Sequence, residues 1–240
     1  MNNSVKNLSG MQAILLHLAP GIPIIFVAFA LSNPYWGIGL PFMLSIYLAI
    51  AFGLIPTELL ILYIVAHRSG KKIKDVIFFT EKTSLLRSIL WILPLFTFLG
   101  FAFAILPEVE KPMWTMFNWV PEWFRIDIDL IKQQPSFIWP AILLAFVFNG
   151  LLGPIVEEIY FRGFLLPRMS NLGKLAPLVN VVLFSLYHFF TPWENITRIV
   201  AMLPLVYAVW YNKNIRIGII VHCLGNLTGT ILTAVFLLSA

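Results

Sequence analysis

The sequence predicts an all-α membrane protein, a polytopic bundle of about seven transmembrane helices with a polar cavity inside the membrane. Three observations predict this fold. Hydrophobic residues make up 60% of the 240 residues and charged residues only 11%, whereas soluble domains carry about 25% charged residues. The mean hydropathy is +0.88. The apolar residues gather in segments close to the roughly 20 residues that span a bilayer, without the alternation typical of a membrane β-barrel.

The first three apolar segments precede any candidate site. The first, 12–32, follows Lys6 and has small residues at Ala28 and Ala30, as a signal peptide does, but its apolar stretch is longer, so we expect a retained helix. The second contains one glutamate, Glu58, and the third contains no charge. Because backbone polar groups in lipid must be satisfied internally, each segment is expected to be helical. These three spans are predicted at 12–32, 41–66 and 88–106.

The later four segments contain most of the buried polar residues. The fourth ends in VEEIYFRG at residues 156–163, where three charges follow a long apolar run. The fifth and sixth are short for spanning helices, and the seventh is of ordinary length. These four spans are predicted at 137–166, 176–190, 197–212 and 217–238.

The connecting loops differ in charge. Residues 68–87 contain six basic and two acidic residues, whereas residues 107–136 contain three basic and five acidic ones. The positive-inside rule therefore predicts that 68–87 and the N-terminus are cytoplasmic and that 107–136 is outside. The three tryptophans of 107–136 predict an amphipathic element at the outer interface. We expect an integral membrane protein of a bacterial plasma membrane, and the net charge of +5 gives no reason to expect a nucleic-acid partner.

Ionisable residues inside a membrane span are costly and indicate function. Glu158 and Arg162 are four residues apart, so on a helix they meet on one face and neutralise each other. Glu157 points about 100° away from Glu158 and has no such local partner. The spacing predicts one structural and one reactive glutamate; the alternative is that both glutamates pair with cations or line a polar cavity.

Two further spans add polar residues. Asn180, Phe184 and His188 recur every four residues and are predicted to share a face, while His222 and Asn226 project together from the last span. At about 1.5 Å per residue, Glu157, His188 and His222 reach the inner half or middle of the bilayer. Such a set activates water and stabilises an oxyanion, or it binds zinc through two histidines and a carboxylate. The single cysteine, Cys223, is expected to be an apolar filler.

Three short motifs occur in order, EEIYFR at 157–162, FSLYH at 184–188 and HCLGN at 222–226. They fit EExxxR, FxxxH and HxxxN, and together they resemble the CPBP family of intramembrane proteases, which includes CAAX prenyl endopeptidases and bacterial Abi proteins. The resemblance covers about 140–230. The first 135 residues match only as generic membrane helices. We expect one integral-membrane domain over 1–240, with the protease-like core at about 137–238. HExxH, GxGD and GxSG, the motifs of other intramembrane proteases, do not occur.

The resemblance also implies roles for six residues. Glu157 would be the general base, Glu158 and Arg162 would organise the site, and His188 would hold the water or a metal. His222 and Asn226 would complete the site and stabilise the oxyanion. If zinc is bound, its ligands would be Glu157, His188 and His222; a metal-free glutamate mechanism is preferred, because Asn226 shares the face of His222 as an oxyanion donor would.

Two other functions compete with peptide hydrolysis. One is a bacteriocin or toxin immunity protein of the same fold that does not need proteolysis, and the other is a proton-coupled transporter that uses the buried carboxylates. The complete set of site residues favours the protease, and the absence of an internal repeat argues against the transporter. The expected partners are the lipid bilayer and a membrane-associated peptide or protein substrate. The sequence leaves the role of Glu58 open between pairing with Arg162, contact with substrate and exposure to a polar crevice.

Overall fold

The computed structural model describes residues 6–239; residues 1–5 and 240, the two ends of the predicted single domain, lie outside the described residues. Within that range the chain is helical, and the only extended pairing is an isolated bridge between Thr80 and Asn214. The α-helices are α1 (Gly10–Leu18), α2 (Gly21–Ser32), α3 (Phe42–Ala49), α4 (Ile55–Arg68), α5 (Leu85–Ile105), α6 (Pro107–Met116), α7 (Ile128–Lys132), α8 (Ile138–Leu144), α9 (Gly153–Glu157), α10 (Ala176–Leu186), α11 (Asn195–Asn212) and α12 (Ile215–Leu238).

The predicted all-α membrane bundle is confirmed, but the count of seven spans is not. Five helical stretches of the described chain are long and apolar enough to cross a membrane. Helix α11 is not among them, since it contains Arg198 and begins and ends with asparagine. The fourth and fifth predicted spans run together, and the chain turns between them at Gly173, whose φ is +54°. The five stretches are Gly10–Ser32, Phe42–Arg68, Leu85–Ile105, Pro135–Leu186 and Ile215–Leu238.

Several of these stretches are interrupted by π-helical or 3₁₀ turns. The segments η1 (Ile50–Leu54), η5 (Ala145–Leu152) and η6 (Glu158–Leu165) are π-helical. Pro56 and Pro154 lie in the first turns of α4 and α9, directly after η1 and η5. Proline lacks a backbone N–H, which suits the first turn of a helix, and π-turns are frequent at functional sites. The shorter 3₁₀ elements are η2 (Ile73–Asp75), η3 (Glu122–Phe124), η4 (Pro135–Phe137), η7 (Leu166–Leu175) and η8 (Pro192–Glu194).

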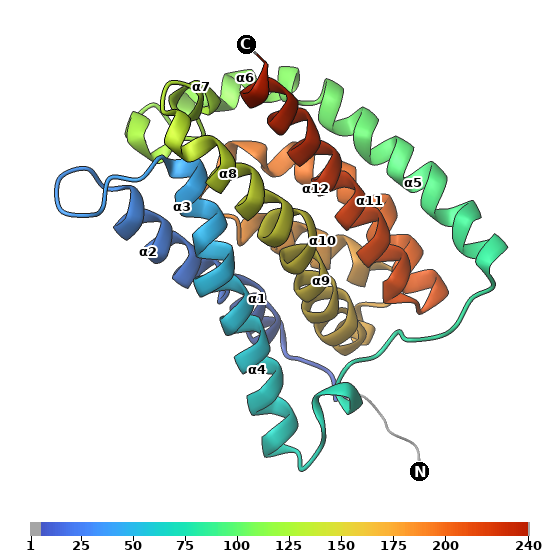
Figure 1. Ribbon diagram of the computed structural model, residues 1–240. Helices are drawn as coiled ribbons and strands as arrows, with labels where there is room; N and C mark the ends of the chain where they lie inside the picture. The colour runs from blue at the N-terminus through green and yellow to red at the C-terminus, as the bar shows by residue number, and fades with distance from the viewer. Residues whose placement is uncertain (1–5, 240) are drawn as a thin grey trace.

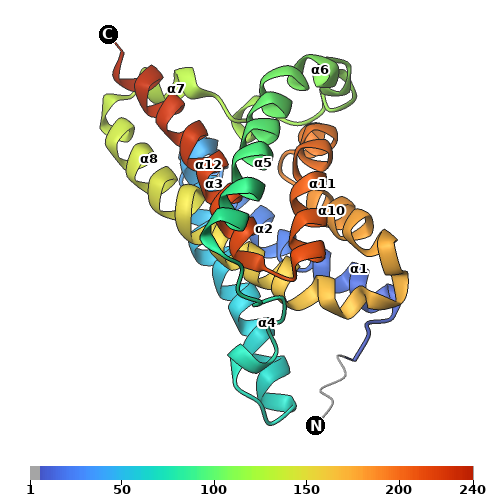
Figure 2. The same cartoon turned by 90° about the vertical axis from the view of Figure 1, so that its right-hand side faces the viewer.

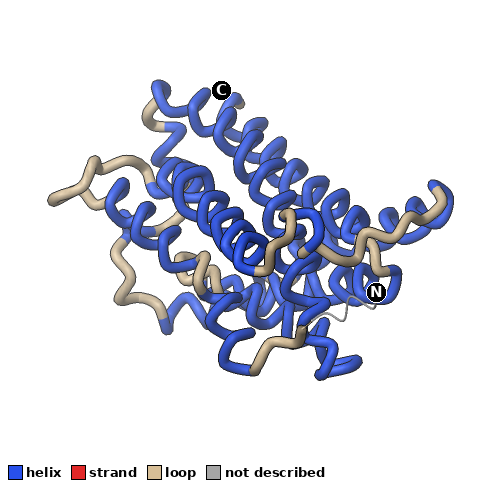
Figure 3. The backbone as a smooth tube through the Cα atoms, turned by 90° about the horizontal axis from the view of Figure 1, so that it is seen from below, coloured by secondary structure: helices blue, strands red, loops and turns tan. Residues whose placement is uncertain are grey.

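Helix α9 lies inside the bundle. It packs between α4 on one side and α12 on the other, while α5 packs along α11 and α12 (Figure 1). The described N-terminal end and the loop after α4 lie at one end of the bundle, and α6, α7 and the end of α12 lie at the other (Figures 1 and 2). Helices make up almost all of the tube in Figure 3, with loops at their ends. The fold therefore surrounds the Glu157–Glu158 pair with helices from both halves of the chain.

The 107–136 segment is not a simple amphipathic element. It folds into α6, η3 and α7 and packs onto the turn before α11, where the Trp114 ring stacks on Trp193 with centroids 4.6 Å apart. Glu110 accepts a hydrogen bond of 2.7 Å from the backbone N–H of Thr197, which satisfies a free donor in the first turn of α11. Its predicted position at the outer membrane interface stays a prediction.

Candidate active site

Glu157 is the last residue of α9 and lines a cavity of about 510 Å³. Only 5% of the residue is exposed. Its Oε1 accepts a hydrogen bond from the hydroxyl of Tyr187, and its Oε2 lies 3.8 Å from His222 Nε2. The carboxylate therefore faces the cavity with one oxygen held by a donor and the other directed towards an imidazole.

Glu158 and Arg162 form the pair predicted from their spacing. Glu158 Oε1 lies 3.1 Å from Arg162 Nη1, and both side chains are fully buried. The Arg162 guanidinium also lies over the Phe184 ring, 4.0 Å from its centroid. Neither residue lines the cavity of Glu157. Because opposite charges in a low-dielectric interior neutralise each other, this pair can remain ionised beside the site without taking part in its chemistry.

His222, on α12, lies between the two glutamates. Its Nδ1 is 3.1 Å from Glu158 Oε1, while Nε2 faces Glu157. An ionised carboxylate can only accept hydrogen bonds, so Nδ1 carries a proton, and in the neutral form of the ring Nε2 is the acceptor. Glu158 thus fixes the tautomer and orientation of His222.

His188 and Asn226 reach the same cavity from different elements. The predicted helix 176–190 is too long: α10 ends at Leu186, and His188 lies in the following turn. His188 Nδ1 is 3.0 Å from the carbonyl oxygen of Phe184, so its Nε2 is free to act as an acceptor. Asn226 donates one N–H to the Asn149 carbonyl at 2.9 Å, which leaves its second N–H free.

Asn180 does not share the face of His188, contrary to the spacing prediction. Its Nδ2 is 2.9 Å from His17 Nε2 and donates to the Phe161 carbonyl at 3.0 Å. The prediction assumed one straight helix through residue 190, whereas α10 ends at Leu186, before His188. Asn180 and His17 therefore form a separate buried contact between α1 and α10.

Tyr187 and an ion pair that also lines the cavity were not predicted from the sequence. Tyr187 lies next to His188 in the FSLYH motif, but no spacing rule directs it towards Glu157. Glu194 and Arg198 also line the cavity, and Arg198 Nη2 donates to Glu194 Oε2 at 2.9 Å. Desolvation raises the pKa of the Glu194 carboxyl, and the positive charge of Arg198 opposes that shift. Four-residue spacing in ENITR was the only sequence signal for this pair.

Glu58 lies in the first turn of α4, fully buried, and does not line the cavity. Neither of its carboxylate oxygens has a hydrogen-bond partner in the part of the chain that the structure describes. Arg162, the protein partner predicted for Glu58, forms an ion pair with Glu158 and, within the described residues, with no other carboxylate. The structure therefore shows neither an ion pair between Glu58 and Arg162 nor exposure of Glu58 to the cavity.

Two glycines of α12 differ in their surroundings. A Cβ at Gly225 would lie 2.7 Å from Leu99 of α5, so this glycine allows a close approach between the two helices. A Cβ at Gly229 would meet nothing within 4 Å, so no neighbouring helix requires a glycine there. The free thiol of Cys223 is buried, with the Leu151 carbonyl 3.8 Å from its sulfur.

The predicted zinc ligands are of the correct chemical type but are not grouped as a metal site. Two imidazole nitrogens and a carboxylate suit catalytic zinc. In residues 6–239, however, no three His, Cys, Asp or Glu side chains are arranged so that they could hold a metal ion. As the side chains stand, Glu157, His188 and His222 do not fit zinc.

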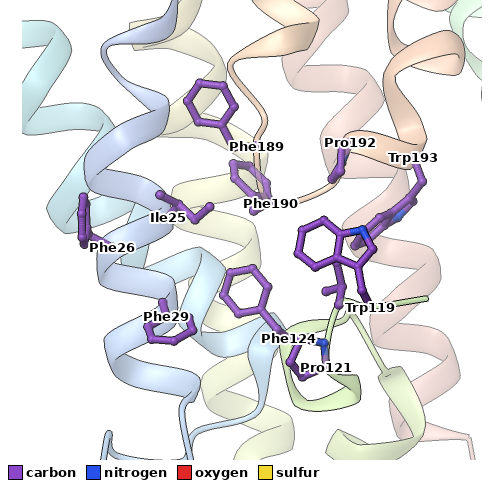
Figure 4. Close-up of a pocket in the computed structure, with 11 residues that line it drawn as sticks. Ile25, Phe26, Phe29, Trp119, Pro121, Phe124, Phe189, Phe190, Pro192 and Trp193 are labelled. Carbon is purple, nitrogen blue, oxygen red and sulfur yellow. The ribbon is translucent and has the colours of Figure 1, made fainter. Parts of the chain in front are cut away.

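A second cavity, of about 360 Å³, adjoins the first. Figure 4 shows rings from α2, from residues 119–124 and from the turn after α10 facing one another across it. Phe190 lines both cavities, two residues after His188. The lining of the second cavity is aromatic and aliphatic, so it is suited to an apolar group.

Comparison with known proteins bears on the second half of the chain. Residues 139–228 match the family described as Rce1-like, type II CAAX prenyl endopeptidase. The matched segment contains all six predicted site residues. No curated protein and no solved structure matches the chain. The three motifs, the helical membrane fold and this match over residues 139–228 support membership of the CPBP family of intramembrane proteases.

Proposed function

We propose that this protein is an intramembrane endopeptidase that hydrolyses a peptide bond with a water molecule activated by Glu157. The observation that supports this most directly is the difference between the two adjacent glutamates. Glu157 lines the cavity, whereas Glu158 is paired with Arg162 behind it. A general base must reach its substrate and accept a proton, and only Glu157 meets both conditions.

The side chains around Glu157 divide the work of the reaction. The Tyr187 hydroxyl holds Oε1, so the attacking water meets Oε2. The water directs one proton towards Glu157 Oε2 and donates its second to Nε2 of either His222 or His188, which orients it. Glu157 removes one proton as the water oxygen attacks the carbonyl carbon, and it then gives that proton to the amine as the carbon–nitrogen bond breaks. The products are a carboxylic acid and a free amine.

Negative charge develops on the substrate carbonyl oxygen during the attack. The second N–H of the Asn226 amide is a donor in the same cavity, and its first N–H is fixed by the Asn149 carbonyl. A donor held in position before the reaction stabilises an oxyanion without reorganisation at the moment of attack, and loss of one such donor costs about 10²–10³-fold in kcat. Asn226 is therefore assigned to the oxyanion.

The substrate is proposed to be a membrane-associated peptide with a bulky apolar group. The matching family is named for prenyl substrates, and the apolar cavity lined by Phe190 adjoins the cavity of Glu157. A prenyl chain beside the scissile bond would suit this arrangement.

The general base is tested with Glu157→Gln on a peptide with such a group. Glutamine keeps the size and polarity of the side chain but cannot accept a proton, so turnover should fall by about 10²–10⁴-fold. Membrane abundance should stay near the wild-type level. Glu108→Gln is the matched control, because this glutamate is exposed and pairs only with Lys111. Cleavage by Glu157→Gln at the rate of the control would contradict the assignment.

The mechanism is proposed to be metal-free. Water activation by Glu157 and an oxyanion donor at Asn226 need no metal, and the three candidate ligands are not grouped to hold one. Active protein purified in mild detergent should contain well under one metal ion per chain and should stay active in a strong chelator. Stoichiometric zinc, with activity lost on chelation and restored by zinc alone, would contradict the metal-free mechanism.

A further inference from the structure

We propose that Arg198 is a positioning residue that holds the turn between α10 and α11, and with it His188 and Tyr187, in place beside Glu157. The effect on kcat that tests this inference depends on the proposed function, whereas the effect on the mobility of the turn does not. Arg198 lies outside the three family motifs, one turn into α11. Its side chain is 9% exposed.

The Arg198 guanidinium joins both ends of this turn. Nη1 lies 3.5 Å from the Ser185 hydroxyl, near the end of α10, and 3.3 Å from Asn195 Oδ1, at the start of α11. Nη2 donates to Thr191 Oγ1 and to Glu194 Oε2, each at 2.9 Å. A single rigid group thus contacts residues before, within and after the turn.

The acceptors are also connected to each other. The Ser185 hydroxyl lies 2.9 Å from Asn195 Oδ1 and donates to the Asn195 carbonyl at 3.1 Å. Hydrogen-bond networks of this kind strengthen when every member is satisfied, and they lose more than one bond when the central group is removed. The network therefore closes the gap between α10 and α11 on the side of the cavity.

Apart from the Tyr187–Glu157 hydrogen bond and the packing of its rings, such as Trp193 on Trp114, the turn is held by local hydrogen bonds. Its backbone bonds are short-range, such as those from His188 N–H to the Ser185 carbonyl at 3.2 Å and from Thr191 N–H to the His188 carbonyl at 3.1 Å. Among the described residues, the His188 side chain has one hydrogen-bond contact, with the Phe184 carbonyl, and its ring packs against Tyr187 and Phe190 with centroids 4.0 and 5.5 Å away. Because misplacement of a reacting group by 1 Å costs about 10²-fold in rate, a residue that fixes this turn affects turnover without touching the substrate.

Lysine and arginine differ at such a position. A lysine keeps the positive charge, but its single ammonium group cannot reproduce the planar fork that reaches four acceptors. Arg198 also lines the cavity, so direct contact with a substrate carboxylate is the competing role. Its hydrogen bonds to four protein side chains favour positioning, and the two roles predict different kinetics.

The experiment compares Arg198→Lys with Arg168→Lys. Arg168 is a buried arginine of η7, the element before α10; its Nη1 donates to the Val76 and Phe164 carbonyls, and it does not line the cavity. Two quantities are measured in detergent: kcat and KM on an apolar-modified peptide, and hydrogen–deuterium exchange of segment 187–194. Thr191→Val removes one acceptor and leaves the charge unchanged.

Arg198→Lys should lower kcat by about 10²-fold with KM changed less than about threefold, and should speed exchange within 187–194. Thr191→Val should change both quantities in the same direction and by less, and Arg168→Lys should change neither. If Arg198→Lys keeps the wild-type kcat, or if its hydrogen–deuterium exchange in 187–194 is unchanged, the proposal is overturned. A raised KM with unchanged kcat would also overturn it, in favour of substrate contact. If the wild-type protein cleaves no peptide, the exchange measurement alone decides.

Discussion

At the scale of single residues, adjacent positions in this chain have opposite roles. Glu157 and Glu158 are neighbours, yet one faces the cavity and the other is fully buried against Arg162 and His222. The helical rotation of about 100° per residue separates them. A buried ion pair is costly to break, because removing one partner leaves an uncompensated charge.

The Glu158–Arg162 pair can be tested by a double-mutant cycle. Glu158→Gln or Arg162→Gln alone should cost about 3–5 kcal/mol of stability, seen as a lower unfolding temperature in detergent and lower membrane abundance. The double variant should recover much of that stability without recovering activity, because His222 still lacks its carboxylate partner. Additive losses in the double variant would contradict the pairing.

Sequence spacing predicted contacts within one helix better than contacts between helices. The Glu158–Arg162 pair follows from i,i+4 geometry alone. The contact of Tyr187 with Glu157 joins residues 30 positions apart, and the isolation of Glu58 depends on how α4 packs against α9. Neither has a periodic signal, so the sequence could name these residues as polar but could not assign them partners.

At the scale of elements, α12 must approach the Glu158 carboxylate closely. A Cβ at Gly218 would overlap Glu158 Oε2 and lie 3.1 Å from a methyl group of Val209. Gly218 is one turn before His222, so a shift of α12 would also move His222 away from both glutamates. The glycine therefore serves the site by permitting contact between α12 and the helix of the glutamates.

Gly218→Ala tests this approach. Overpacking should destabilise the protein by about 1–3 kcal/mol, and turnover should fall further than that of the equally small change Gly10→Ala. A Cβ at Gly10 would meet nothing within 4 Å. The measurements are cleavage rate and unfolding temperature in detergent. Wild-type activity in Gly218→Ala would show that α12 does not need this close contact.

Helices were predictable from apolar length, whereas their breaks and ends were not. Phe189 and Phe190 extend the apolar run of the fifth predicted span, but the structure uses them to line the aromatic cavity beyond the end of α10. Pro20, Pro56 and Pro154 mark breaks that a hydropathy window averages away. Tertiary packing decides where such a run stops being helical.

At the scale of the whole molecule, the ends of the bundle differ in charge. The basic loop after α4 lies at the same end as the described N-terminal residues, and the acidic 107–136 segment lies at the opposite end with the end of α12 (Figures 1 and 2). The backbone of Glu81 donates to the Lys213 carbonyl at 3.0 Å, so the connection between α11 and α12 also meets the basic loop. The bundle thus groups basic segments that are far apart in sequence.

This grouping predicts the orientation of the protein in the membrane. By the positive-inside rule the basic end is predicted to be cytoplasmic. In a Cys223→Ser background, a cysteine introduced at Lys111 should react with a membrane-impermeant thiol reagent in intact cells, and one at Lys72 should react only after permeabilisation. Both lysines are exposed in the structure, so accessibility within the fold does not limit either reaction. If the reagent labels Lys72→Cys but not Lys111→Cys in intact cells, the topology is the opposite of the predicted one. The basic loops would then lie outside, against the charge rule.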